Sequence, residues 1–117
     1  MKTDKLKAPS TEEILAAAEI LQDVVENTPL THNSNLSDKY GANIYLKRED
    51  LQVVRSYKIR GAFNKIADLS EKEKANGVVC ASAGNHGQGV AYACNKLAIN
   101  CTVFMPTPTP SQTAARP

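Results

Sequence analysis

The sequence predicts an α/β fold with parallel strands, on the strength of three neighbouring segments. Two short apolar runs, Val78–Ala81 and Cys101–Met105, have the composition of buried strands. Between them, Asn85–Leu97 is amphipathic and has the length of a crossover helix. A strand, a helix and a strand in so short a span form a βαβ unit, whose strands pair in parallel. We therefore expect a parallel βαβ unit over residues 78–105.

The chain begins with a predicted helix. Ser10 followed by Glu13 fits a capping box, and apolar residues then recur at helical spacing, which predicts a helix over residues 11–26. Pro29 ends it, because the residue before a proline avoids the α region.

A loop and one strand are expected next. Residues 30–41 are expected to form a loop with a short helical turn near residues 35–39. Residues 43–47 alternate between apolar and polar side chains, which is typical of a strand.

A second helix is predicted to begin after Ser56, which can cap it, and to end near Leu69. Its apolar stripe consists of Ile59, Phe63 and Ile66. Residues 70–77 are strongly charged and are expected to form a turn before the βαβ unit.

Composition excludes several classes of protein. With 117 residues and 42% hydrophobic content, the chain suffices for one small domain. Fourteen basic and twelve acidic side chains give a net charge of only +2, so we expect no nucleic-acid partner. No run of about 18 apolar residues is present, so we expect no membrane span.

The cysteines favour a reducing compartment. Three cysteines are an odd number and none forms a C-x-x-C pair, which indicates reduced thiols in a cytoplasmic protein. The start of the chain lacks the apolar stretch of a secretory signal. Cys80, His86, Cys94 and Cys101 lack the usual spacing of metal ligands, so we expect no metal site.

A glycine-rich turn, residues 82–89, lies between the first apolar strand and the helix after it. Ligands bind where parallel strands end, because a helix begins there with free N–H groups and a positive dipole end. The spacing G-x-x-G-x-G is neither a dinucleotide fingerprint nor a P-loop. The turn is thus either an anion site or a turn whose glycines serve close packing, and His86 is either a base or a simple cap.

Lys58 is the candidate nucleophile. It lies in the first turn of the second predicted helix, where the helix dipole and the nearby Arg55 and Arg60 disfavour an ammonium ion. A neutral lysine amine attacks aldehydes, whereas the alternative is an ordinary solvated lysine. Glu49 and Asp50 are adjacent and would face opposite ways in a strand, so we expect no acid–base pair from them.

Three segments in this order and spacing, residues 45–52, 55–62 and 82–86, closely resemble the biosynthetic threonine dehydratases (threonine ammonia-lyases). More broadly they resemble the tryptophan-synthase-β-like family of pyridoxal-phosphate enzymes, which implies the N-terminal part of a fold type II architecture. Two positions depart mildly from the common pattern: Tyr57 stands where phenylalanine is frequent, and Gly87 where alanine is frequent.

The resemblance also implies residue roles. Lys58 matches the lysine that binds pyridoxal 5′-phosphate covalently and later moves the substrate α-proton. Asn85 matches the asparagine that hydrogen-bonds the cofactor 3-hydroxyl. The loop that receives the substrate carboxylate corresponds to Ser82, Ala83, Gly84, Asn85 and His86. The implied reaction converts L-threonine to 2-oxobutanoate and ammonia, the first step of isoleucine biosynthesis.

The family's catalytic region is well over twice as long as this chain. We therefore expect residues 1–110 to be its N-terminal portion, residues 111–117 to be an irregular tail, and the chain to be inactive alone. The family also implies a homo-oligomer. Three alternatives stay open: a serine racemase, a catabolic deaminase acting on L-threonine or L-serine, and a fragment without enzymatic activity.

Overall fold

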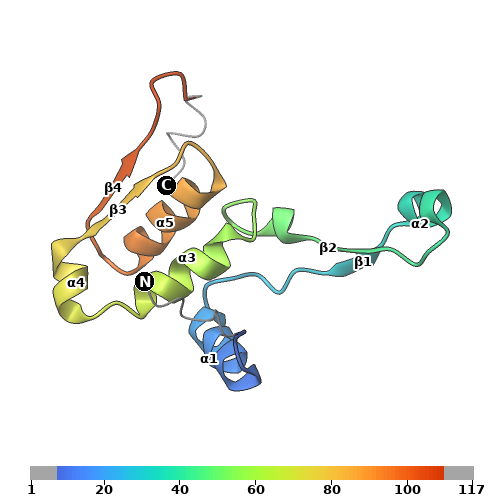
Figure 1. Cartoon of the computed structure of the whole chain (residues 1–117), viewed down its shortest axis with the longest axis horizontal. Coiled ribbons are helices and arrows are strands. Elements are labelled where there is room, and N and C mark those ends of the chain that lie inside the picture. Colours follow the sequence, from blue (N-terminus) through green and yellow to red (C-terminus); the bar gives the residue numbers. More distant parts are fainter. Residues whose placement is uncertain (1–7, 110–117) are drawn as a thin grey trace, which may run out of the picture.

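The structure is a computed structural model and describes residues 8–109 (Figure 1). The expected irregular tail, residues 111–117, lies outside the described residues. The described elements are, in chain order, α1 (Thr11–Leu21), β1 (Leu30–His32), α2 (Ser34–Tyr40), β2 (Tyr45–Lys47), the 3-10 helix η1 (Glu49–Leu51), α3 (Lys58–Ala67), α4 (Glu71–Asn76), β3 (Val78–Ala81), α5 (Asn85–Lys96) and β4 (Cys101–Phe104).

The predicted βαβ unit is confirmed. β3 and β4 pair in parallel, with Val78 opposite Cys101 and Ala81 opposite Phe104. Burial alternates along both strands, because α5 covers one face of the pair. The other face carries Val79 and Phe104, which are 67% and 61% exposed. The architecture is therefore α/β, as the sequence predicts.

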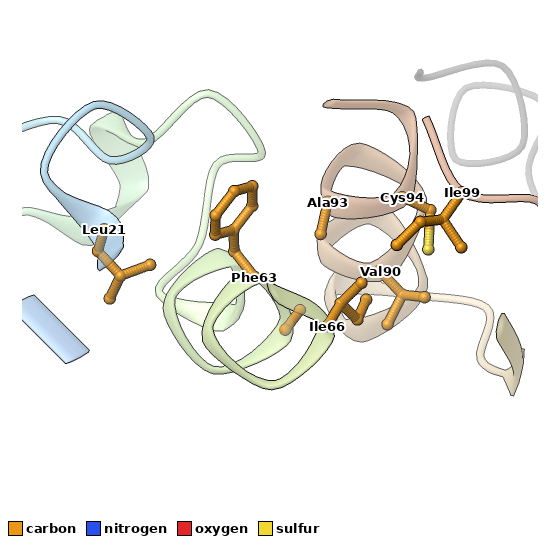
Figure 2. Packing of buried hydrophobic residues seen from close by; sticks show 8 residues of the cluster. Leu21, Phe63, Ile66, Val90, Ala93, Cys94 and Ile99 are labelled. Atoms are coloured by element: carbon orange, nitrogen blue, oxygen red, sulfur yellow. The ribbon is translucent and has the colours of Figure 1, made fainter. Parts of the chain in front are cut away.

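The hydrophobic core lies mainly between α3 and α5, which run side by side with their N-termini at the same end (Figure 1). Figure 2 shows the side chains that fill this contact, among them Phe63 and Ile66 from α3 and Val90 and Ala93 from α5. Gly89 sets the closeness of the contact. A Cβ there would lie 3.2 Å from both the carbonyl carbon and the carbonyl oxygen of Lys58, tighter than ordinary van der Waals contact.

A two-stranded arm projects from this body (Figure 1). β1 and β2 pair antiparallel, with Leu30 opposite Lys47, and α2 lies at the tip between them. The two ends of the arm are joined at its base, where the N–H of Arg48 donates to the carbonyl of Pro29 at 3.0 Å. The Lys47 ammonium donates to the carbonyl of Thr28 beside this bond.

Three expectations about local structure are wrong. The first helix ends at Leu21 rather than near residue 26, because its last bonds tighten to three-residue turns, as in Val24 N–H to Leu21 carbonyl. The expected loop over residues 30–41 contains β1, which forms because β2 lies alongside it; the helical turn expected near residues 35–39 is confirmed as α2. The expected charged turn at 70–77 contains α4, because Ser70 and Glu73 form a capping box.

The second helix also differs from its prediction. Ser56 does not cap α3: Tyr57 occupies the cap position without a side-chain bond, and Ser56 Oγ is buried with no partner among the described residues. The helix ends at Ala67, two residues before the expected Leu69. Between residues 8 and 109, no helix has the length and apolarity needed to cross a bilayer.

Candidate active site

An open cleft of about 500 Å³ lies beside α3 and β3, and it contains Lys58 and His86 in its walls. The apolar part of its lining includes Ala62, Ile66 and Val78. A mainly apolar cleft with a few polar groups at its edge is the usual form of a small-molecule site. The structure thus brings together two of the residues that the sequence singled out.

Lys58 is the first residue of α3 and is half-buried. Its Nζ lies 5.1 Å from the centroid of the Tyr57 ring, within the range of a cation–π contact. Arg60 and Lys65 line the same cleft. The cleft therefore places a second basic side chain, Lys65, near the Lys58 amine, which suits a ligand that carries both an aldehyde and an anionic group.

Ser82 shapes the glycine-rich turn at the start of α5. Its Oγ accepts hydrogen bonds from the N–H groups of Gly84 at 3.2 Å and Gly87 at 3.0 Å. A Cβ at Gly87 would lie 2.9 Å from the Ser82 carbonyl oxygen, so an alanine here would require the loop to shift. The hydroxyl of Ser82 thus stabilises the loop itself, and Gly87 is a glycine that serves close packing.

The anion-site interpretation concerns the next two residues. Asn85 and His86 are the first residues of α5, and their N–H groups have no acceptor among the described residues. A 12-residue helix presents its positive dipole end there. Since α3 and α5 begin at the same end of their contact, both helix N-termini face one region of the molecule (Figure 1).

The remaining loop residues lie outside the cleft. Ala83, Gly84 and Asn85 are exposed and Ser82 is half-buried. Of the five loop residues 82–86, only His86 lines the cleft. The structure therefore places Lys58 and His86 in one cavity and presents the other four on the loop beside it.

Sequence reasoning missed a polar cluster around Glu49. Both carboxylate oxygens of Glu49 accept from the Arg60 guanidinium, at 2.7 and 2.8 Å, and the Thr28 hydroxyl donates to the same carboxylate at 2.6 Å. The hydrogen bonds from Arg60 lower the pKa of Glu49 to about 2, and those from Thr28 and Gln52 add to the effect. No local signal reveals this pair, because the two residues are eleven positions apart on different elements.

The buried thiol of Cys94 is not a candidate nucleophile. Burial raises the pKa of Cys94 to about 12, and the neighbouring Cys101 adds to the rise, so the Cys94 thiol stays protonated at neutral pH. All three cysteines are free. Within residues 8–109, no group of three or more His, Cys, Asp or Glu side chains is placed to hold a metal ion.

The residues present fit pyridoxal phosphate. A lysine amine can join its aldehyde, the apolar cleft wall can take its ring, and the helix N-termini can take anionic groups. A parallel βαβ unit that packs against a helix beginning with such a lysine is the arrangement of an α/β enzyme with a lysine-bound cofactor. The family described as "Pyridoxal-phosphate dependent enzyme" matches residues 21–117, and the chain belongs to this family.

Similar proteins agree with this assignment. The chain is 59% identical over 101 residues to the "L-threonine dehydratase biosynthetic IlvA" of Halalkalibacterium halodurans. This match covers 86% of the chain and 24% of that protein. The protein of that name from Bacillus subtilis is 59% identical over 99 residues, with 85% and 24% covered. The chain spans about a quarter of the length of these curated relatives.

Solved structures confirm the expected fold type II architecture. Threonine deaminase isoform 2 from Solanum lycopersicum has a TM-score of 0.74 and 40% identity, and the match covers 92% of this chain and 33% of that one. Maize serine racemase has a TM-score of 0.86 and 28% identity, with 94% and 33% covered.

Proposed function

We propose that residues 1–110 form the N-terminal, lysine-bearing portion of a catalytic domain that acts as a threonine ammonia-lyase. Its reaction would convert L-threonine to 2-oxobutanoate and ammonia. The observation that carries the proposal is the position of Lys58 at the start of α3, in an apolar cleft and against the first turns of α5. The 59% identity to the two curated dehydratases supports the choice of substrate.

Each site residue has a physical role in this proposal. When bound, pyridoxal phosphate supplies the aldehyde that joins the protein and the ring that accepts electrons from the substrate. Lys58 would hold the cofactor through its amine and would carry the proton from the substrate α-carbon. The Asn85 amide would hold the ring by a hydrogen bond to its 3-hydroxyl. The free N–H groups of Asn85 and His86 hold the substrate carboxylate, within the loop that Ser82, Ala83 and Gly84 complete.

The net reaction needs no oxidant or reductant. The α-carbon loses a proton and the β-carbon loses its hydroxyl group, which together leave as water; the β-carbon then takes up a proton, and a water molecule replaces the nitrogen, so that L-threonine gives 2-oxobutanoate and ammonia. The protein therefore has to place the reacting groups, which is the usual contribution of the protein in a cofactor-dependent enzyme.

A second candidate is action on L-serine, as a serine racemase or a serine/threonine deaminase. The observation in its favour is the TM-score of 0.86 with maize serine racemase. The two candidates share Lys58 and the loop, so they differ in product: pyruvate or D-serine from L-serine, against 2-oxobutanoate from L-threonine.

Two properties of the whole enzyme belong to the same proposal. We infer a cytoplasmic location, because all three cysteines are free and buried or half-buried, as in a reducing compartment. We also infer assembly into a homo-oligomer, which rests on the family resemblance alone.

The first test labels the lysine. The chain is incubated with pyridoxal phosphate, reduced with borohydride and mapped by mass spectrometry. Label should concentrate on Lys58 and disappear from that peptide in Lys58→Ala. Lys65→Ala is the matched control, because Lys65 lines the same cleft. Label spread evenly over the ten lysines would contradict the assignment.

The second test measures turnover in a chimera in which this chain replaces the matching quarter of the Bacillus subtilis relative. Release of 2-oxobutanoate from L-threonine, lost in the Lys58→Ala chimera, is the expected result. Faster formation of pyruvate or D-serine from L-serine would favour the second candidate instead.

A further inference from the structure

A polar cluster shares Arg60 with the lining of the cleft that contains Lys58. We name it the Glu49 clamp: Glu26, Thr28, Glu49, Gln52 and Arg60. Its centre is the Glu49 carboxylate, whose two oxygens take the two guanidinium bonds and the Thr28 hydroxyl bond. Gln52 is fully buried, and its side-chain amide pairs with the backbone of Glu26 in both directions, each bond being 2.9 Å long. The clamp joins the chain before β1 to η1 and α3.

The clamp holds the chain on both sides of Lys58. Arg60 follows Lys58 by two residues on α3, and Gln52 precedes it by six. Between them Arg55 has a left-handed backbone with φ of 61°, which is strained for a residue other than glycine. The Arg55 N–H donates to the Gln52 carbonyl at 2.8 Å. The strained segment is therefore anchored to the clamp at its start, and α3 is anchored to it just after Lys58.

We propose that Glu49 is a positioning residue for Lys58. Its carboxylate fixes Arg60 and Thr28, and these contacts keep residues 53–57, which include the strained Arg55, in their observed conformation and the Lys58 amine in the cleft. The inference rests on the proposed function of Lys58. Bidentate pairing with a guanidinium fixes direction as well as distance, which a single hydrogen bond would not do. A misplacement of about 1 Å at a reacting group can cost on the order of a hundredfold in rate.

The test compares Glu49→Gln with Asp50→Asn in the full 117-residue chain. Asp50 is the matched control, because it lies next to Glu49 and also pairs with an arginine, but on the exposed surface. Each variant is treated with pyridoxal phosphate and borohydride, and label is counted at every lysine. Glu49→Gln should lower the yield at Lys58 about tenfold relative to the other nine lysines, and Asp50→Asn should change it less than twofold. An unchanged Lys58 yield in folded Glu49→Gln overturns the proposal.

A second pair of variants separates positioning from stability. Arg55→Ala and Arg55→Gly remove the same charge, but only glycine relieves the left-handed strain. Because glycine relieves the strain that the clamp opposes, we expect Glu49→Gln to lower the Lys58 yield about tenfold in the Arg55→Ala background and about threefold or less in the Arg55→Gly background. An equal loss of Lys58 yield in the two backgrounds also overturns the proposal, because the effect of Glu49 would then not depend on the strain at Arg55.

Two measurements keep the test decisive. If Glu49→Gln does not fold, Thr28→Val takes its place, because it removes the 2.6 Å bond to Glu49 and keeps the side-chain shape. If the unaltered chain gives no Lys58 adduct, the proposed function fails at that step, and trace acetic anhydride then measures the amine directly. A changed pH profile of Lys58 acetylation in Glu49→Gln, but not in Asp50→Asn, supports positioning, and identical profiles refute it.

Discussion

Glu49 makes the stability of this chain depend on pH in the acidic range. Its pKa is lowered from 4.5 to about 2 by the hydrogen bonds from Arg60. A carboxyl group with a lowered pKa in the folded state stabilises that state above the unfolded pKa. The contribution is therefore complete above about pH 5 and is lost as the pH falls through 4.5 towards 2. Glu49→Gln has no such contribution at any pH.

The size of the effect follows from the change in proton affinity. Each tenfold change is worth about 1.4 kcal/mol, so a fall in pKa from 4.5 to about 2 corresponds to about 3 kcal/mol at neutral pH. The Glu49 side chain is only 16% exposed, but that of Arg60 is 36% exposed, and water screens the pair on that side. We therefore expect wild type to exceed Glu49→Gln by about 2 kcal/mol of unfolding free energy at pH 7.

The assay is urea unfolding followed by circular dichroism at intervals from pH 7 to pH 2.5, on wild type, Glu49→Gln and Asp50→Asn. The difference between wild type and Glu49→Gln should be constant from pH 7 to 5 and then shrink steadily. A difference that keeps its size down to pH 2.5 would show that the carboxylate charge is not what Glu49 contributes.

Three further substitutions test the packing that surrounds the site. Gly77→Ala should lower the free energy of unfolding by about 1–3 kcal/mol, because φ is 82° and a Cβ would lie 2.9 Å from the Asn100 carbonyl oxygen; urea titration measures this. Ser82→Ala should cost about 1 kcal/mol and speed hydrogen exchange at the Gly87 amide, whose acceptor it removes. Gln52→Leu should cost about 2–3 kcal/mol in thermal unfolding, because it leaves both backbone groups of Glu26 without these bonds.

The sequence predicts best those elements whose signals are local. β3, α5 and β4 are each defined by their own composition, and the order of the three already implies parallel pairing. β1 carries no comparable signal, because all three of its residues are exposed and it exists only through pairing with β2. α4 does carry a signal, the capping box from Ser70 to Glu73, but it has no apolar stripe to confirm a helix.

The candidate site divides in the same way. Lys58 and the loop at residues 82–86 are recognisable from the chain itself, and the structure adds that His86 shares the cleft with Lys58. The ion pair between Glu49 and Arg60 could not be predicted, because charged residues occur throughout the sequence and only the packing of η1 against α3 selects these two. The role of Gly89 could not be predicted either, because only the structure shows that a side chain at this position would press against the backbone of Lys58.

The arm formed by β1, α2 and β2 leaves the body and returns to it at nearly one point, where Arg48 bonds to Pro29. The entropic cost of closing such a segment grows only with the logarithm of its length, so that doubling the number of residues in the arm costs about 0.6 kcal/mol of stability. We therefore expect insertions or deletions at the tip of the arm to cost little stability as long as the bond at its base is kept. The base of the arm is thus the point at which the length of the arm becomes independent of the packing of the body.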